Sequence, residues 1–233
     1  MAWTLAQYAS DAELVPVLAG EIAATLTAAV QARGRATLAV SGGSTPRGLF
    51  AALAASDLPW ADITVTLVDE RWVSSEHADA NARLVRDHLL QGPAASARFV
   101  GLTTSAASPF EAVAEVDERL RAQAMPLDVA VLGMGEDGHT ASFFPGAAEL
   151  PAALNDAQRL CCGIRPPCAP HLRMTLTLSC LLGASRLFLH LVGAGKRAVL
   201  EAAMQEGPVA ALPVRAVLHN PRLPLEIHYA EKP

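Results

Sequence analysis

Residues 127–146 read LDVAVLGMGEDGHTASFFPG, and this stretch decides where a fold and a function should be sought. The apolar run 127–132 indicates a buried strand, which ends at once in a glycine-spaced loop carrying Glu136, Asp137 and His139. Ligands of α/β proteins bind where parallel strands end, because the backbone stops pairing there and opens a crevice. A histidine in such a loop can exchange a proton near neutral pH. The loop therefore predicts proton-transfer chemistry at His139, with an acid such as Asp137 orienting its ring.

Strand-like and helix-like runs alternate on both sides of this loop. Helical spacing of apolar residues covers 11–32, 46–55, 79–90, 109–124 and 196–205. Runs typical of strands cover 36–40, 63–68, 99–102, 128–132, 173–178, 186–192, 214–218 and 225–229. The pattern loosens after Pro151. Alternating strands and helices predict an α/β fold with a mostly parallel sheet and helices on both faces, in one domain spanning residues 1–233.

Composition narrows the class of protein. The 233 residues are 52% hydrophobic with a net charge of −5, which favours a globular core and argues against general nucleic-acid binding. The first fifteen residues lack the basic region of a targeting segment. The most apolar stretch, 180–195, is interrupted by Arg186 and His190 and is too short to span a bilayer. We therefore expect a soluble cytoplasmic protein with no membrane partner.

Metal and cofactor motifs are not predicted. The four cysteines, Cys161, Cys162, Cys168 and Cys180, form no CxxC pair and no metal-ligand spacing, so we expect reduced core thiols. Gly133, Gly135 and Gly138 match GxGxxG, but a dinucleotide fingerprint should open a helix and be followed by a strand ending in an acid. Here Pro145 follows quickly, and the sequence shows no such acid. We expect neither a metal nor a cofactor.

Other strand ends carry groups that suit an anion. The strand 36–40 runs into SGGSTP, where Gly43, Ser44 and Thr45 precede a helix, a layout that can cradle a phosphate. Alternatively, this segment is only a turn that caps the following helix. Asp69 and Arg71 follow the strand 63–68; Arg71 could fork onto a phosphate and Asp69 could accept from sugar hydroxyls, or the two could form an internal ion pair.

Two further basic residues suit the same role. Lys196 lies in GAGK, after the strand 186–192, and is one of only two lysines in the chain. It could reach an anion or be a surface lysine beside a helix end. Arg173, in HLRMTLT, is a weaker candidate of the same kind. Phosphate-binding groups at three strand ends, with an acid–base loop at a fourth, together indicate an enzyme acting on a sugar phosphate.

These segments together resemble the 6-phosphogluconolactonase family. The resemblance runs, in the family's order, through SGGSTP (41–46), DERWV (69–73), Asn81, GMGEDGHTASFFPG (133–146), RMTLT (173–177) and GAGK (193–196). Within the signature GxGxDGHTASLFPG the chain differs only in having Phe143 for leucine. The resemblance implies a modified Rossmann-like fold, shared with glucosamine-6-phosphate deaminase and ribose-5-phosphate isomerase.

The resemblance also implies an activity, namely hydrolysis of 6-phosphoglucono-1,5-lactone without metal or cofactor, in the oxidative pentose phosphate pathway. His139 falls at the position of the catalytic base. Gly43, Ser44, Thr45, Arg71 and Lys196 fall at phosphate-facing positions, and the resemblance implies an assisting role for Arg173. Whether Asp137 or Asp69 orients His139 stays open, as does a monomeric or homodimeric state.

Two alternatives remain to be weighed. Glucosamine-6-phosphate deaminase shares the DGH core, but its motif has a glutamate five residues after the histidine, where this chain has Phe144, and typically a tyrosine in place of Arg71. A non-catalytic sugar-phosphate sensor would carry a DNA-binding segment, and no helix-turn-helix pattern precedes residue 11. Both comparisons favour the lactonase.

Overall fold

A seven-stranded, entirely parallel sheet forms the centre of the computed structural model, which describes residues 3–232. In spatial order its strands are β1 (Trp3–Ser10), β10 (Leu225–Lys232), β9 (Arg186–Val192), β6 (Val129–Leu132), β2 (Ala36–Val40), β3 (Ile63–Leu67) and β5 (Arg98–Val100). All five residues of β2 are buried, as expected for a strand covered on both faces. The predicted α/β architecture is confirmed.

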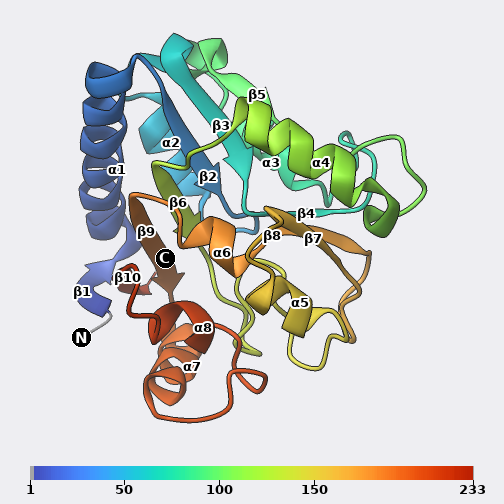
Figure 1. The fold of residues 1–233 in the computed structure, drawn as a ribbon. Coiled ribbons are helices and arrows are strands. Elements are labelled where there is room, and N and C mark those ends of the chain that lie inside the picture. Colours follow the sequence, from blue (N-terminus) through green and yellow to red (C-terminus); the bar gives the residue numbers. More distant parts are fainter. Residues whose placement is uncertain (1–2, 233) are drawn as a thin grey trace.

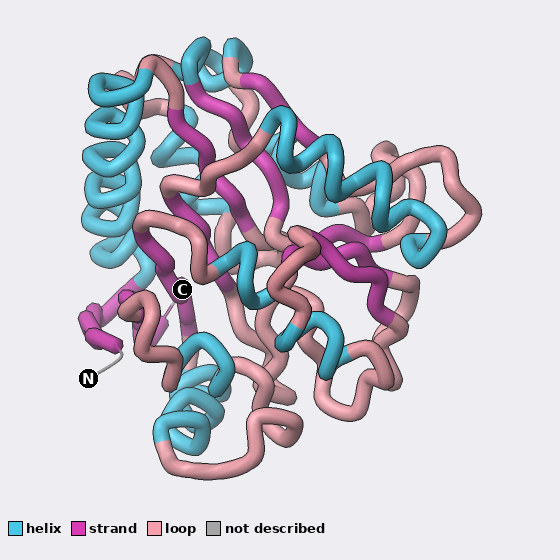
Figure 2. The backbone as a smooth tube through the Cα atoms, viewed as in Figure 1, coloured by secondary structure: helices cyan, strands magenta, loops and turns pink. Residues whose placement is uncertain are grey.

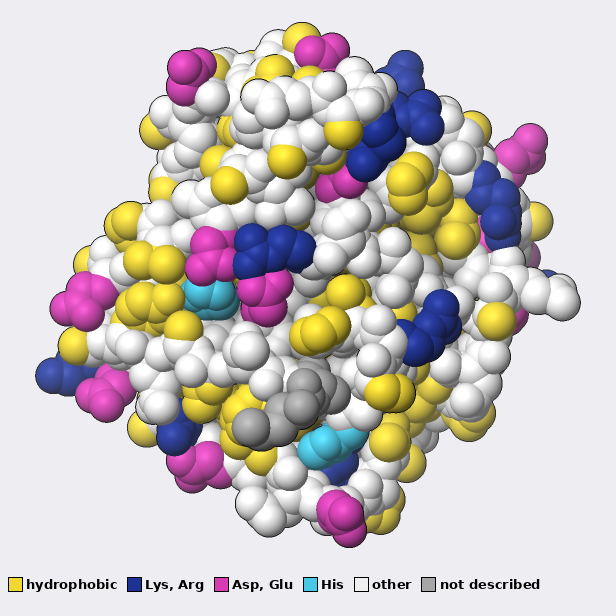
Figure 3. Space-filling model, turned by 60° about the vertical axis from the view of Figure 1, so that its left-hand side comes forward, with side chains coloured by type: hydrophobic (Ala, Val, Ile, Leu, Met, Phe, Trp, Pro, Cys, Tyr) yellow, Lys and Arg dark blue, Asp and Glu magenta, His cyan; other side chains and the backbone are white. Residues whose placement is uncertain are grey.

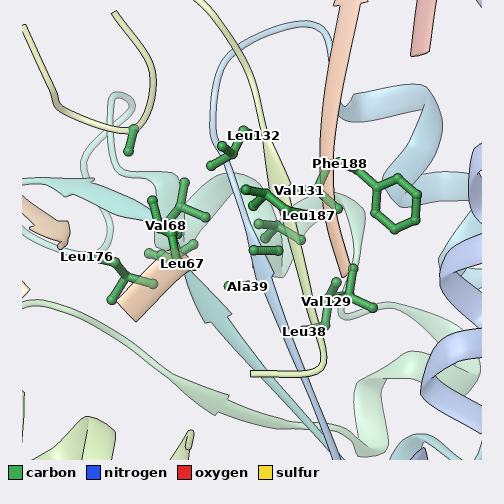
Figure 4. Close-up of a cluster of buried hydrophobic side chains, with 14 of the residues drawn as sticks. Leu38, Ala39, Leu67, Val68, Val129, Val131, Leu132, Leu176, Leu187 and Phe188 are labelled. Carbon is green, nitrogen blue, oxygen red and sulfur yellow. The ribbon is translucent and has the colours of Figure 1, made fainter. Parts of the chain in front are cut away.

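Helices cover both faces of this sheet (Figure 1). They are α1 (Asp11–Arg33), α2 (Arg47–Ala54), α3 (Asn81–His88), α4 (Pro109–Gln123), α5 (Leu150–Asn155), α6 (Leu178–Leu181), α7 (Ala194–Met204) and α8 (Arg215–Leu218), with short 3-10 turns η1 (Trp60–Asp62) and η2 (Gly92–Ser96). In Figure 1, α4 lies in front of the sheet and α2 behind it. The core fills the layers between them, where β2, β3, β6 and β9 carry most of the apolar side chains labelled in Figure 4.

A second, three-stranded antiparallel sheet adjoins the first. It consists of β4 (Asp69–Arg71), β8 (Arg173–Leu176) and β7 (Cys161–Ile164). Val68 links the two sheets, because its N–H donates to Val40 O of β2 (2.9 Å) and its carbonyl accepts from Leu176 N–H of β8 (2.8 Å). The chain therefore leaves the main sheet at Val68, and the residues that follow lie at the edge where the parallel strands end.

Helix α1 is long and apolar enough, by length and composition alone, to cross a membrane. In this fold, however, Leu14, Leu18, Ile22 and Leu26 are completely buried in the core cluster. These contacts are those of a core helix in a globular protein. Figure 3 brings forward the left-hand side of the view in Figure 1. On this face, acidic and basic side chains are interspersed with apolar ones.

The structure corrects several boundaries. Residues 214–218, expected as a strand, contain helix α8, because the guanidinium of buried Arg215 reaches back to the carbonyls of Ala202 (2.8 Å) and Ala203 (3.4 Å) at the end of α7. The expected strand 173–178 exists as β8 but lies in the small sheet. Strands β1, β4 and β7 and helix α5 were not anticipated; β1 alternates half-buried and exposed residues and lacks an apolar run.

Candidate active site

Four neighbouring strands of the main sheet, β9, β6, β2 and β3, end side by side, and the loops that follow them enclose a cavity of about 260 Å³. Figure 2 shows loop segments gathered below the sheet, where these strands end. Of the residues predicted from the sequence, the structure brings the following together in the cavity lining: Gly43, Ser44, Thr45, Asp69, Arg71, His139 and Lys196. Five of the seven lie in the segments that follow β2 and β3, whereas His139 lies in the loop after β6 and Lys196 follows β9.

His139 and Asp137 form a hydrogen-bonded pair within the loop after β6. The imidazole Nδ1 lies 2.5 Å from Asp137 Oδ1, and the same oxygen accepts the backbone N–H of His139 at 3.1 Å. This bond lowers the pKa of the Asp137 carboxyl. An ionised Asp137 accepts a proton-bearing Nδ1, which leaves the Nε2 lone pair of a neutral imidazole free to take a proton.

The loop that carries this pair depends on Gly135. Its N–H donates to the carbonyl of His139 at 2.8 Å, closing a tight turn. A Cβ at position 135 would lie 2.1 Å from His139 Nδ1 and 2.4 Å from Asp137 Oδ1, well inside contact distance. Thr140 Oγ1 donates to Gly133 O at 2.8 Å and fastens the other end of the loop. Glycine at 135 is therefore required for the two side chains to meet.

One face of the His139 ring is covered by Phe144. The ring centroids lie 4.4 Å apart with planes inclined by 30°, and Phe144 is itself buried. Behind it, the guanidinium of Arg173 lies 5.9 Å from the centre of the Phe144 ring. Arg173 is buried, and it does not contribute to the cavity lining of the described chain; burial and the adjacent Arg71 lower the pKa of its guanidinium. Arg173 thus lies against Phe144 rather than in the described lining of the cavity.

The loop after β2 presents unpaired donors. Within residues 3–232, the backbone N–H groups of Gly43, Ser44 and Thr45 donate to no other protein group. They precede α2, whose N-terminus adds a favourable field for an anion. The loop is held against Asn81, since a Cβ on Gly42 would lie 1.8 Å from Asn81 Oδ1. Such a set of donors suits phosphate oxygens.

Two cationic side chains flank that loop. Arg71 donates from Nη1 to the carbonyl of Asp79 at 2.6 Å, which fixes its orientation at the rim. Lys196, in the first turn of α7, donates from Nζ to Met134 O in the loop after β6. Burial lowers the pKa of the Lys196 ammonium, while the nearby Glu136 and Asp137 carboxylates oppose that change. The two cations approach the cavity from different strand ends.

The Asp69 carboxylate pairs with Ser142 rather than with Arg71 or His139. Its Oδ2 accepts from Ser142 Oγ at 2.6 Å, and its backbone carbonyl accepts from Asn81 Nδ2 at 2.8 Å. Asp137, and not Asp69, accepts the hydrogen bond from the His139 ring. Asp69 nevertheless lines the cavity, where a second carboxylate oxygen can meet a polar ligand.

Two residues near the cavity have structural parts that the sequence does not predict. Glu70, buried beneath Arg71, accepts the backbone N–H groups of Asn81 and Ala82, each at 2.7 Å, and so holds the start of α3. Burial raises the pKa of the Glu70 carboxyl, although these N–H donors oppose it. Asn81 itself lines the cavity, and its buried Oδ1 has no hydrogen-bond partner among the described residues. The sequence DERW gave no local signal that Glu70 turns inward.

The expectation of four core thiols holds for two. Cys161 and Cys180 are buried, which raises the pKa of each thiol to about 12. Cys162 is half-buried and Cys168 is exposed. All four are free, as expected for reduced cysteines.

Comparison with known proteins places the chain among sugar-phosphate enzymes. A family profile described as glucosamine-6-phosphate isomerases/6-phosphogluconolactonase matches residues 9–224. A 6-phosphogluconolactonase of Rhizobium meliloti is 45% identical over 96% of this chain and 97% of its own length, and one of Pseudomonas aeruginosa is 45% identical over 95% and 92%.

Solved structures agree with this placement. The crystal structure of a 6-phosphogluconolactonase from Shewanella baltica superposes with a TM-score of 0.95 at 42% identity, covering 98% of this chain and 97% of that one. A monomeric glucosamine-6-phosphate deaminase shares the fold, with a TM-score of 0.78 at 17% identity over 97% of each chain.

Proposed function

Since this chain belongs to the glucosamine-6-phosphate isomerase/6-phosphogluconolactonase family, we propose that it hydrolyses 6-phospho-D-glucono-1,5-lactone to 6-phospho-D-gluconate, with His139 as general base. The observation that carries this proposal is the His139–Asp137 hydrogen bond beside a cavity that is also lined by two cations and by a loop whose N–H groups have no partner within residues 3–232. A base and an anion site in one cavity suit a substrate that carries a phosphate away from its reacting carbonyl.

The chemistry needs one base and one water molecule. Nε2 of neutral His139 takes a proton from water as the water oxygen attacks the lactone carbonyl carbon, giving a tetrahedral oxyanion and an imidazolium held by Asp137. Collapse of that intermediate breaks the ring C–O bond, and the imidazolium returns its proton to the departing ring oxygen. A δ-lactone is an activated ester, so no covalent enzyme intermediate is required.

The phosphate supplies the binding energy that orients the ring. Arg71 and Lys196 offer charge-assisted hydrogen bonds, and the Gly43–Thr45 loop offers neutral donors at the start of α2. Asp69 is suited to accept from a sugar hydroxyl. Fixing the substrate at both ends converts the attack into an effectively intramolecular step. In this scheme Arg173 positions two other residues: it pairs with Arg71 between β4 and β8, and its guanidinium lies against the ring of Phe144.

The two alternatives are less well supported. In the deaminase reading, a carboxylate should lie near the acid–base histidine at position 144, but the ring of Phe144 occupies that place. In the sensor reading, a preorganised base would have no task, whereas Asp137 and Gly135 hold His139 in a defined orientation. A small-molecule substrate, a cytoplasmic location, a single domain and a monomeric or homodimeric state complete the proposal.

A coupled assay tests the function directly. Glucose-6-phosphate dehydrogenase generates fresh lactone in situ, and 6-phosphogluconate formation is followed with spontaneous hydrolysis subtracted. We expect strong acceleration by the protein and no release of ammonia from glucosamine 6-phosphate. Ammonia release would support the deaminase, and binding of 6-phosphogluconate without turnover of lactone would support the sensor.

A further inference from the structure

Beside the cavity, outside the groups that act on the lactone, three side chains with metal-ligating atoms converge: His77, Asp79 and His171. One ligand atom from each lies within 4.8 Å of the other two. We propose that these residues form a binding site for one divalent transition-metal ion, with Zn²⁺ as the ion that the ligand set fits best. None of the three ligand atoms takes part in the hydrolytic reaction, and the inference does not depend on the proposed function.

The spacing of the ligand atoms matches a zinc site. His171 Nε2 lies 3.1 Å from Asp79 Oδ2, and His77 Nδ1 lies 3.8 Å from the same oxygen. In a tetrahedral site with bonds of about 2.0–2.1 Å, neighbouring ligand atoms lie about 3.4 Å apart. The two separations from Asp79 bracket that value, and the third pair of ligand atoms lies within 4.8 Å, so binding would draw the two imidazoles closer together.

The donor chemistry also fits this class of metal. Two imidazoles and one carboxylate are ligands that zinc takes in proteins, and the fourth position can be filled by water. All three side chains reach solvent, with exposed fractions of 46% for His77, 53% for Asp79 and 28% for His171, so an ion has open access. Alkaline-earth ions prefer oxygen-rich sites and suit this set less well.

The backbone already brings the two contributing segments together. Trp72 N–H donates to Leu172 O at 2.8 Å, which joins the segment before His77 to the residue after His171. His171 itself is held at φ 66°, in the left-handed region that non-glycine residues seldom adopt. This conformation directs the His171 ring to Asp79, across 92 residues of sequence.

Metal binding requires a defined exchange of partners. His77 Nδ1 now accepts the backbone N–H of Asp79 at 3.1 Å, and the ion would replace that donor at the same lone pair. His171 Nε2 must bear no proton when it binds the ion, so the neutral ring carries its hydrogen on Nδ1. The present hydrogen bond between His171 Nε2 and Asp79 Oδ2 would then be replaced by bonds from both atoms to the same ion. Binding therefore depends on pH through histidine protonation, as for other such sites.

The experiment measures zinc affinity on the intact protein. Metal-free protein competes with a chromophoric chelator for Zn²⁺, and we expect one ion per chain. His171→Ala and Asp79→Asn should each weaken binding by at least about tenfold. His88→Ala, which removes another partly exposed histidine on α3, should bind as the wild type does. Unfolding curves for the variants check that each remains folded.

Two further variants separate this site from competing ligands. Cys168 is an exposed free thiol close in sequence to His171, and His139 with Asp137 is a second histidine–carboxylate pair. We expect Cys168→Ser and His139→Ala to retain the ion, and Co²⁺ substituted for Zn²⁺ to show no thiolate charge-transfer band. Absence of stoichiometric binding in the wild type, undiminished binding in both His171→Ala and Asp79→Asn, or loss of the ion in Cys168→Ser or His139→Ala would overturn the proposal.

Discussion

The imidazole of His139 stacks on the phenyl ring of Phe144, with centroids 4.4 Å apart and 30° between the ring planes. This contact gives the proposed base an apolar neighbour on one face and leaves Asp137 as the carboxylate to which it is hydrogen-bonded. A neutral neighbour adds no negative charge that would stabilise the imidazolium.

Replacing Phe144 with glutamate should therefore move the acid limb of the rate profile to higher pH, by about one unit, because a second carboxylate stabilises protonated His139. Phe144→Gln is the matched control, since glutamine has the shape of glutamate but carries no charge. The measurement is kcat/KM against pH, corrected for spontaneous hydrolysis. Identical profiles for the glutamate and glutamine variants would show that the charge at this position is irrelevant.

Asp137→Asn should lower kcat by roughly 10²–10⁴-fold, because an amide does not hold the Nδ1–H tautomer or stabilise the imidazolium. KM should change little, since Asp137 does not line the cavity. Steady-state kinetics on fresh lactone check this, together with the affinity for 6-phosphogluconate by calorimetry. A variant with normal kcat would assign the orientation of His139 to another group.

Arg71→Ala and Lys196→Ala should each reduce kcat/KM for the phosphorylated lactone by about tenfold to a hundredfold, the effect of losing a charge-assisted contact worth about 1.5–3 kcal/mol. The slower reaction on unphosphorylated gluconolactone should be nearly unaffected, because that substrate lacks the contact. Arg47→Ala is a suitable control, since Arg47 is exposed beside the same loop but outside the cavity lining. Equal losses on both lactones would remove these residues from the phosphate site.

The lowered pKa of Lys196 leads to a prediction about alkaline pH. A lysine whose pKa is lowered loses its charge at a lower pH than an ordinary lysine, while the phosphate remains a dianion. Affinity for 6-phosphogluconate should therefore fall as pH rises toward the alkaline range. Lys196→Arg keeps its charge there and should flatten this fall. Parallel curves for the two proteins, measured by calorimetry, would contradict the role given to Lys196.

Much of the architecture could be predicted because the main sheet is parallel and buried. Strands such as 36–40 and 128–132 are continuous apolar runs, and the loops that follow them carry the conspicuous polar residues. Since neighbouring parallel strands end at the same edge, the convergence of Gly43, Arg71, His139 and Lys196 followed from topology alone.

The remainder depends on contacts that are distant in sequence. β4 is only three residues long, and it exists because Arg71 pairs with Arg173, about a hundred residues later. The helix at Arg215–Leu218 depends on carbonyls at the end of α7. The pairing of His139 with Asp137 rather than Asp69 likewise depends on how the loop folds, because both acids follow strand ends.

The most direct test of the central claim is the turnover of His139→Ala on lactone made in situ. We predict a loss of roughly 10²–10⁴-fold in kcat with the affinity for 6-phosphogluconate largely retained, because the base acts on water and other residues of the cavity are proposed to hold the phosphate. Near-normal turnover after correction for spontaneous hydrolysis would contradict the account and place the base at another residue.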